Sequence, residues 1–348
     1  MSSIGKVKPG QTQEKEEKGN VEKIKITSEE DIEKRLFESL KQHELPDYLL
    51  YTGRGGAKNW LKLDGAETFP VARQLKVLLE KNIASIVRFI PTGMSLISVG
   101  VGSGDKERIL LEELINKNLA EKPASGKVSI RYYPIDISSQ FVDIALEKVS
   151  DLPVEKQGIV GFIEEMPLLK RYWRLPVLFC ILGNTLCNYD PEFILKLVYE
   201  NLEQGDLFLF DADLLPAQRS GEEAKFARKS VLGTYASREN ALFNMYPLLQ
   251  YGMDPEDFDF ELLLGHVYSR IGEVYRTRKN INILKDAEIK IGQETIALRE
   301  GDIIRMGFTY KYTYEQIIAF LDICGFEVLN SFLNEDRSNA IILAKKRL

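Results

Sequence analysis

The sequence predicts an α/β fold with a Rossmann-like, doubly wound parallel sheet that ends in an antiparallel hairpin, plus a second α+β lobe. Short apolar runs alternate with amphipathic helical segments from residue 94 to residue 211, which is typical of a parallel sheet with helices on both faces. This alternation stops over residues 214–308 and resumes afterwards. Two β-like runs, 326–333 and 340–345, flank a polar turn and close the chain.

Each element follows from its own pattern. Fully apolar runs are typical of buried parallel strands, and helical periodicity with a capping residue marks each helix. The expected strands are 95–99, 128–135, 157–162, 176–182 and 206–211. The expected helices are 105–118, 138–149, 191–202 and 314–324.

The domain organisation follows from the same patterns. Residues 1–24 are polar and rich in Lys and Glu, so we expect a disordered tail. Residues 25–90 form an N-terminal helical segment that begins near Thr27 or Ser28. Residues 91–213 and 309–348 form the core. Residues 214–308 form an insertion that binds substrate, with a helical stretch at 222–249, acidic loops, and β-like runs at 273–283 and 288–298.

Composition excludes several classes of protein. The net charge is −6 and no basic stripe is present, so we expect no nucleic-acid partner. No apolar run reaches the roughly 18 residues of a membrane span, and the polar N-terminus is no secretory signal, so we expect a cytoplasmic protein. The three cysteines and two histidines have no metal-ligand spacing, so we expect free thiols and no metal. We expect a monomer or weak oligomer.

A glycine-rich loop is the first candidate binding site. Gly100, Gly102, Ser103 and Gly104 follow a strand and open a helix, where small residues let the backbone approach a ligand and leave amide donors free. Lys106 in the first helical turn suits a carboxylate, although an exposed helix lysine explains it equally well. Together with Asp136 at the end of the next strand, the loop predicts an adenosine-containing ligand.

Two further features sit at the ends of strands. Asp136 ends the second strand, where a carboxylate can accept hydrogen bonds from ribose hydroxyls. Gly183 and Asn188 follow the fourth strand, at the edge of the sheet where ligands bind. Asn188 can present its amide to a polar substrate or simply cap a turn. The G-x-G-x-G spacing and the terminal hairpin favour a methyltransferase that uses S-adenosylmethionine over a nicotinamide-dependent dehydrogenase.

An ordered set of motifs resembles the histidine-specific methyltransferase family, whose best-known member Nα-trimethylates histidine and whose relatives methylate tryptophan derivatives. The motifs, from residue 99 onward, are V-G-V-G-S-G-D-K, Y-P-I-D-I-S, I-V-G-F and L-G-N-T-L-C-N-Y. The resemblance covers roughly residues 45–345. It implies a class I methyltransferase sheet and S-adenosyl-L-methionine as cofactor.

The resemblance also implies roles for individual residues. The family's glycine loop matches 99–104, its lysine matches Lys106 with a one-residue length difference, and its strand-two aspartate matches Asp136. Its G-D-F beside the adenine looks like Gly161 and Phe162, and Gly183 is expected at the cofactor. Its substrate asparagine matches Asn188, and its substrate tyrosines look like Tyr51 and Tyr235.

Departures from the family affect the methyl acceptor. The glutamate and serine that grip the imidazole in histidine methyltransferases fall on Gly307 and Thr309. The aspartate between Gly161 and Phe162 is missing, and Glu67 to Arg73 loses a tyrosine hydroxyl. Losing a polar contact of this kind changes substrate preference sharply, so histidine is a doubtful substrate.

Three hypotheses remain open at this point. The first is an N-methyltransferase for a small amine, such as an amino acid or an aromatic derivative, with no residue certain to be catalytic because the cofactor carries its own leaving group. The second is a protein or peptide methyltransferase, since a pocket opened at Gly307 admits a larger side chain. The third is a cofactor-binding module without turnover.

Overall fold

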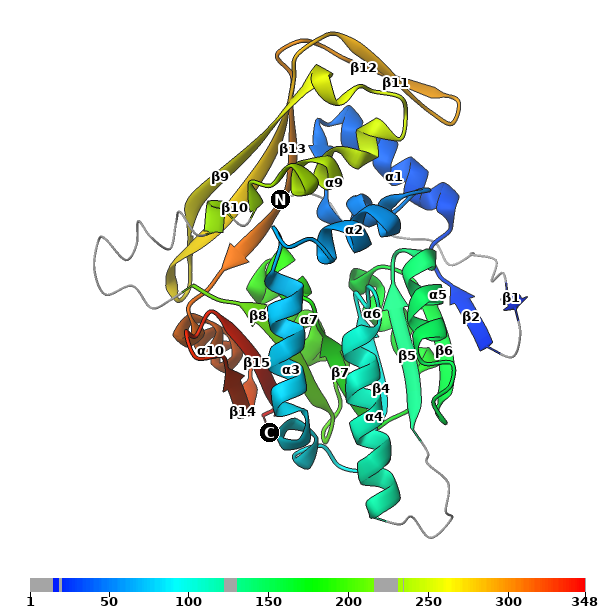
Figure 1. Ribbon diagram of the computed structural model, residues 1–348, viewed down its shortest axis with the longest axis vertical. Helices are drawn as coiled ribbons and strands as arrows, with labels where there is room; N and C mark the ends of the chain where they lie inside the picture. Colours follow the sequence, from blue (N-terminus) through cyan, green and yellow to red (C-terminus); the bar gives the residue numbers. More distant parts are fainter. Residues whose placement is uncertain (1–14, 19–20, 122–129, 216–230, 234, 348) are drawn as a thin grey trace.

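The computed structural model describes residues 15–18, 21–121, 130–215, 231–233 and 235–347. The larger sheet in these ranges runs in the order β1-β2-β6-β5-β4-β7-β8-β15-β14. Figure 1 shows this sheet in the lower half of the molecule, with the long strands β9, β10 and β13 rising above it. The α/β class and the second lobe are therefore both present.

The centre of the large sheet is parallel, as predicted. Adjacent strands from β2 to β8 pair parallel. Every residue of β4 and β7 is buried, because helices cover both faces of the sheet and leave no room for polar side chains. The central strands are β4 (Ser95–Val99), β5 (Arg131–Asp136), β6 (Glu155–Val160), β7 (Val177–Ile181) and β8 (Leu207–Asp213).

Two hydrophobic clusters divide the helices between the faces. One face packs against α3, α4 and α5, and α3 and α4 are drawn in front of the sheet in Figure 1. The other face packs against α6, α7 and α10. The bounds are α3 (Val71–Arg88), α4 (Asp105–Ala120), α5 (Ser139–Lys148), α6 (Met166–Leu169), α7 (Pro191–Asn201) and α10 (Tyr314–Ile323).

The terminal hairpin is confirmed. β14 (Phe326–Leu333) pairs antiparallel with β15 (Asn339–Lys346), and β15 pairs antiparallel with β8. The parallel centre of the sheet is thus followed by antiparallel pairing at β15 and β14, and β1 pairs antiparallel with β2 at the opposite edge. Its switch point lies at β4, between β5 and β7, where the crossovers run in opposite directions.

The disordered tail expected over residues 1–24 falls only partly on described residues: 1–14 and 19–20 lie outside them, whereas 15–18 and 21–24 are in strands. β1 (Lys15–Lys18) and β2 (Val21–Lys25) form a hairpin, and β2 extends the large sheet beside β6. Ile24 and Ile26 join the core of that sheet. Composition suggested too little apolar surface to fold, but one edge of an existing sheet requires only these few apolar side chains.

The second lobe is built around a sheet in the order β3-β13-β10-β9. Its helices lie between that sheet and the large one in Figure 1. The bounds are α1 (Glu29–Lys41), β3 (Glu44–Leu45), α2 (Gly56–Asp64), α9 (Arg238–Leu249), β9 (Phe258–Ser269), β10 (Gly272–Ile283), β11 (Ala287–Ile291), β12 (Glu294–Leu298) and β13 (Ile303–Lys311).

Two expectations for the insertion are corrected. The acidic loops after residue 249 contain β9, which pairs with β10 along its whole length; in its first residues Phe and acidic side chains alternate, the period of a half-buried strand. The expected insertion boundary at residue 308 falls inside β13, which runs on to Lys311. Of the helical stretch expected at 222–249, the structure describes α9, whereas 216–230 and 234 lie outside the described residues.

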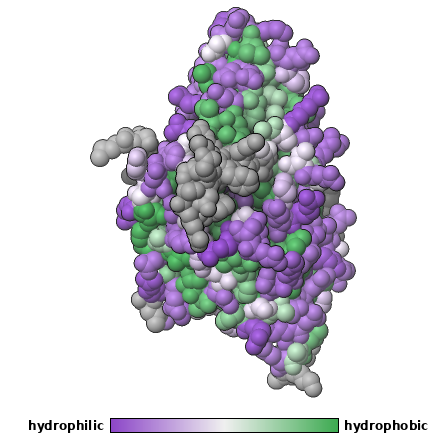
Figure 2. Space-filling model, turned by 60° about the vertical axis from the view of Figure 1, so that its left-hand side comes forward, coloured by the Kyte–Doolittle hydropathy of each residue, from purple (hydrophilic) through white to green (hydrophobic). Residues whose placement is uncertain are grey.

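The surface mixes both kinds of side chain. Figure 2 shows hydrophobic residues gathered on the upper lobe and in smaller groups below, separated by hydrophilic ones. Exposed large hydrophobic residues in the described ranges include Tyr268 of β9 and Leu119 at the end of α4. No helix within those ranges is long and apolar enough to cross a bilayer.

Candidate functional site

A cavity of about 730 Å³ lies between the carboxyl edge of the large sheet and the second lobe. The loops after β4, β5, β6 and β7 line one side, and α2, α9, β10 and β13 line the other. Ligands of open α/β sheets bind outside the carboxyl ends of the strands at the switch point. The cavity stands at that place.

The glycine loop forms the tight turn that its sequence predicts. Gly100, Gly102 and Gly104 all have left-handed backbones, with φ of 69°, 54° and 72°. A Cβ on Gly104 would lie 2.9 Å from the Cα of Ala145 in α5, so the glycine lets α4 start against its neighbour. The loop lines the cavity through Gly100, Gly102 and Ser103.

Asp136 ends β5 beside this loop and is almost fully buried. Its Oδ1 accepts a 2.9 Å hydrogen bond from the backbone N–H of Ser138. Burial raises the pKa of the carboxyl to about 7, and hydrogen bonds from backbone amides, including that of Gly102, act in the opposite direction. No charged partner of this carboxylate is found among the described residues, and it lines the cavity, where its oxygens can accept hydrogen bonds.

Lys106 and Gly183 meet on the opposite side of the loop. The Nζ of Lys106 lies 3.6 Å from Oδ2 of Asp211, and Asp211 accepts hydrogen bonds of 2.7 and 2.9 Å from the backbone N–H of Gly183. A Cβ on Gly183 would lie 3.2 Å from the Nζ of Lys106. Asp211, which the sequence analysis did not single out, thus holds the loop after β7 against the first turn of α4.

Phe162, which also lines the cavity, packs between Arg35 and Tyr48. The guanidinium of Arg35 lies 3.8 Å from the centre of its ring, and Tyr48 meets it edge-on at 5.0 Å. A Cβ on Gly161, the residue before Phe162, would lie 3.2 Å from Oε2 of Glu165. Glu164 lines the cavity close by, and burial raises the pKa of its carboxyl.

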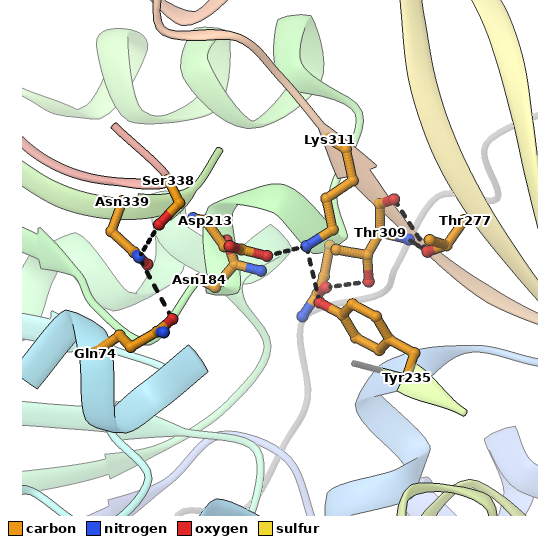
Figure 3. Close-up of polar contacts among 10 residues, drawn as sticks. Gln74, Asn184, Asp213, Tyr235, Thr277, Thr309, Lys311, Ser338 and Asn339 are labelled. Atoms are coloured by element: carbon orange, nitrogen blue, oxygen red, sulfur yellow. Dashed lines mark hydrogen bonds and ion pairs between the residues drawn. The ribbon is translucent and has the colours of Figure 1, made fainter. Parts of the chain in front are cut away.

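Asn188 and Thr309 are joined across the two lobes. The hydroxyl of Thr309 donates a 2.9 Å hydrogen bond to Oδ1 of Asn188. The hydroxyl of Thr277 in β10 donates to the carbonyl of Thr309 at 3.1 Å, as Figure 3 shows. This hydrogen bond engages the side-chain oxygen of Asn188, which lines the cavity.

Tyr235 contacts a buried ion pair formed by Lys311 and Asp213. In Figure 3, the Nζ of Lys311 lies between Asp213 and Tyr235, donating to the carboxylate and, at 3.0 Å, to the phenol oxygen. Lys311 is about 1% exposed, and Asp213 raises its pKa against the effect of burial. The Asp213 carboxylate therefore favours the charged ammonium, whose hydrogen bond to the phenol oxygen does not use the phenol proton of Tyr235.

Tyr51 belongs to an aromatic cluster. Its ring meets Trp60 and Phe243 at 5.4 Å each, and Trp60 meets Phe69 at 6.0 Å. Burial raises the pKa of Tyr51, so its phenol stays protonated. All of these rings line the cavity; only Tyr51 was predicted at the site, because the others lie on helices and loops whose packing the sequence does not reveal.

Gly307 also lines the cavity, beside two charged residues that the sequence analysis passed over. Asp47 and Lys279 form an ion pair of 2.6 Å at this end.

Of the predicted site residues, all except Gly104 line this one cavity. Gly104 lies where the loop packs against Ala145 of α5. Asp47, Lys279, Asp211, Lys311 and the aromatic cluster are the additions that the tertiary structure makes.

The arrangement defines a class of protein. The switch point of a parallel sheet presents a glycine loop and a strand-end acid to one cavity, and the sheet finishes in antiparallel strands. This is the architecture of the S-adenosylmethionine-dependent methyltransferases.

The particular family follows from comparison with known proteins. A family model described as "Histidine-specific methyltransferase, SAM-dependent" matches residues 28–346. The chain belongs to this family and is an S-adenosylmethionine-dependent methyltransferase.

Individual relatives are more distant. The N-methyltransferase FsqC of Aspergillus fumigatus is 23% identical over 310 residues, which cover 86% of this chain and 78% of that protein. Ergothioneine biosynthesis protein 1 of Neurospora crassa is 28% identical over 317 residues. This match covers 88% of the present chain but only 33% of that protein, so the chain spans about a third of its length.

Solved structures align more loosely. A methyltransferase from Clostridium acetobutylicum aligns over 80% of this chain and 92% of its own, at 11% identity and a TM-score of 0.39. The mitomycin 7-O-methyltransferase MmcR aligns over 90% of this chain and 67% of its own, at 10% identity and a TM-score of 0.40. These scores are too low to support an argument about function.

Proposed function

We propose that the protein transfers a methyl group to the nitrogen of a small amine, an amino acid or an aromatic amino-acid derivative. One observation carries the proposal: a single cavity joins the predicted cofactor residues, such as Asp136, to the polar pair that Asn188 of the large sheet forms with Thr309 of the other lobe. Its volume of about 730 Å³ falls in the roughly 300–1,000 Å³ range of small-molecule sites.

The residues present fit S-adenosylmethionine. Asp136 offers an unpaired buried carboxylate for the ribose hydroxyls, and Lys106 offers an ammonium for the methionine carboxylate. Glu107 lines the same cavity and has a buried Oε2 with no hydrogen-bond partner among the described residues, which suits the ammonium of the methionine part. Phe162 and Glu164 would flank the adenine, with Glu164 in the role of the missing aspartate.

The chain's own contribution to the reaction is positioning. When bound, S-adenosylmethionine supplies an electrophilic methyl group whose sulfur leaves as the thioether S-adenosylhomocysteine. The lone pair of a neutral amine forms the new N–C bond, and the resulting ammonium loses its proton to water. Asn188, Tyr51 and Tyr235 would hold the amine in line, which lowers the entropic part of the barrier.

The aromatic cluster has a second role in this proposal. Tyr51, Trp60, Phe69 and Phe243 form a wall that keeps water from the reacting centre. Aromatic faces also attract cations, by roughly 0.5–2 kcal/mol per contact, which suits both the sulfonium before transfer and the alkylammonium after it.

Nitrogen as the acceptor atom is supported by the relatives, one of which is named as an N-methyltransferase. The proposal does not single out histidine, because Gly307 stands where the resemblance places the glutamate that binds the imidazole.

The experiment is a calorimetric titration with S-adenosylmethionine, followed by a mass-spectrometric screen of amino acids, aromatic amines and peptides for methylated product. We expect cofactor binding and methylation of a small amine. Methylation of peptides alone would favour the protein methyltransferase, and cofactor binding without any product would favour a module without turnover. Turnover on histidine alone would show that Gly307 does not exclude it.

A further inference from the structure

The polar end of the cavity is created by an irregularity in β13. Its pairing with β10 changes register between Arg278↔Phe308 and Asn280↔Arg305. One residue of β10, Lys279, therefore faces two of β13, Met306 and Gly307. A bulge of this kind bends its strand and redirects the neighbouring side chains.

Asp47 is brought to the same place by a short parallel pairing. β3 pairs Glu44 with Arg305 and Leu45 with Met306. Two residues after β3, Asp47 begins a 3₁₀ turn, so its side chain lies beside the bulge. A segment 232 residues away in sequence thereby reaches Lys279.

The side chain of Asp47, and not an unusual backbone conformation, requires glycine at position 307. Gly307 is absent from the residues with left-handed φ. A Cβ there would lie 2.4 Å from Cγ of Asp47 and 2.6 and 2.7 Å from its two oxygens, which are impossible contacts. The missing side chain leaves the space that the Asp47 carboxylate fills.

The charges of Asp47 and Lys279 cancel inside the protein. Their side chains are 11% and 9% exposed, and the Nζ–Oδ1 distance is 2.6 Å. Both residues line the cavity. A third, unbalanced charge at this buried pair would carry a large desolvation cost, whereas a neutral donor can share the carboxylate without upsetting the balance.

We propose that Asp47, neutralised by Lys279 and accommodated by Gly307, accepts a hydrogen bond from an uncharged N–H or O–H group at the non-reacting end of the methyl acceptor. Thr309, which orients Asn188, lies two residues from Gly307 on the same strand. At roughly 3.3 Å per residue, the backbone positions 307 and 309, beside which Asp47 and Asn188 lie, are about 7 Å apart. This spacing suits a small amine that ends in a heteroaromatic ring N–H or a carboxamide.

This substrate class rests on the proposed N-methyltransferase function, and the first test is independent of it. Gly307→Ala should lower the melting temperature by roughly 2–4 °C or more in the wild-type background. In an Asp47→Ala background the same change should cost almost nothing, because the clashing carboxylate is gone. Gly265→Ala is the matched control: it lies in the same sheet with no atom within 4 Å of its Cβ. Equal shifts from Gly307→Ala in both backgrounds would overturn the steric assignment.

A second test relocates the carboxylate. The double variant Asp47→Ala/Gly307→Glu removes the carboxylate of Asp47 and places a new one on β13, where it can pair with Lys279. We expect it to be more stable than Gly307→Glu alone, which crowds two carboxylates around one ammonium. A double variant no more stable than that single variant would contradict the pairing that we assign.

The third test measures recognition with defined probes, by calorimetry in the presence of S-adenosylhomocysteine. The pairs are L-tryptophan against 1-methyl-L-tryptophan, and L-glutamine against its side-chain dimethylamide, so in each pair N–H is replaced by N–CH3. For at least one pair we expect the N–H form to bind about tenfold more tightly or better. The double variant Asp47→Ala/Lys279→Met, which leaves no unpaired charge, should lose that preference and still bind the cofactor.

The outcomes separate this inference from the proposed function. Equal binding within both pairs, or binding of neither pair, overturns the role of Asp47 even if another small amine is methylated. A preserved N–H preference in the double variant does the same. Failure of the wild type to bind S-adenosylmethionine or to methylate any amine would instead overturn the proposed function, while the two stability tests would still report on Asp47 and Gly307.

Discussion

The hydroxyl of Thr309 in β13 donates its hydrogen bond to the side-chain oxygen of Asn188, which follows β7, at 2.9 Å. This contact joins the second lobe to the edge of the large sheet and fixes which end of the Asn188 amide faces the cavity. The acceptor half of the site therefore depends on how the two lobes are packed.

Removing this hydroxyl should weaken substrate binding. Thr309→Val keeps the shape of the side chain but loses the donor, so the Asn188 amide is free to turn. We expect KM for the amine to rise about tenfold, with little change in cofactor affinity. Thr309→Ser retains the hydroxyl and is the matched control. A Thr309→Val enzyme with unchanged KM would remove Asn188 from substrate binding.

Cofactor affinity should depend on pH through Asp136. Ribose hydroxyls donate to the ionised carboxylate, whose pKa is raised by burial to about 7 in the free protein. Affinity should therefore fall as the pH drops below about 7, by up to roughly tenfold per pH unit. Calorimetric titrations between about pH 5.5 and about pH 8 measure this slope. Asp136→Asn should bind about tenfold more weakly or worse at pH 8 and show a flat profile; a sloping profile in this variant would assign the titration to another group.

The same raised pKa predicts an opposite effect on the stability of the cofactor-free protein. The contribution of Asp136 is fully present below its unfolded pKa of about 3.9 and is lost as the pH rises through about 7, because ionisation in the buried site is unfavourable. Thermal unfolding without cofactor, compared with Asp136→Asn over this range, measures the difference. A difference that does not change with pH would contradict the buried, unpaired state of the carboxylate.

Breaking the buried pair behind Tyr235 should destabilise the protein. Lys311→Met leaves Asp213 without its counter-charge, and loss of one partner of a buried pair costs about 3–5 kcal/mol. The second change in Lys311→Met/Asp213→Leu should restore part of this stability. Chemical denaturation of the three proteins measures the coupling. Additive losses in the double variant would show that the two residues do not depend on each other.

The glycine loop predicts a contrast between two left-handed glycines. Gly104 and Gly93 have φ of 72° and 79°, so alanine strains both backbones by about 1 kcal/mol. Only at Gly104 does the new Cβ also meet a backbone atom, at 2.9 Å, whereas at Gly93 nothing lies within 4 Å. Gly104→Ala should therefore lower both stability and cofactor affinity clearly more than Gly93→Ala does. Equal effects would show that close packing of α4 on α5 is unimportant.

Much of the core followed from local pattern. Each parallel strand is a short apolar run, since both faces are covered, and Gly100 and Asp136 stand at strand ends whatever surrounds them. The hairpin formed by β14 and β15 was also readable, because a polar turn separates two runs of strand period. The acidic appearance of residues 254–261 concealed β9, and the polar character of residues 1–24 concealed β2, because strands at or near the edge of a sheet carry charged side chains whose sequence resembles that of a loop.

The sequence by itself determined the reaction class, since the glycine loop, the acid at the end of β5 and the Asn188 segment are each continuous stretches with their own local chemistry. The tertiary structure decided the acceptor end of the site. In the sequence, Gly307 indicates only that a carboxylate is missing. In the structure, the space left by its absent side chain is filled by the carboxylate of Asp47, which is paired with Lys279. The physical reason is that a cavity wall consists of side chains that pairing between distant strands brings together, and neither the register of β13 nor its bulge is encoded in any single segment.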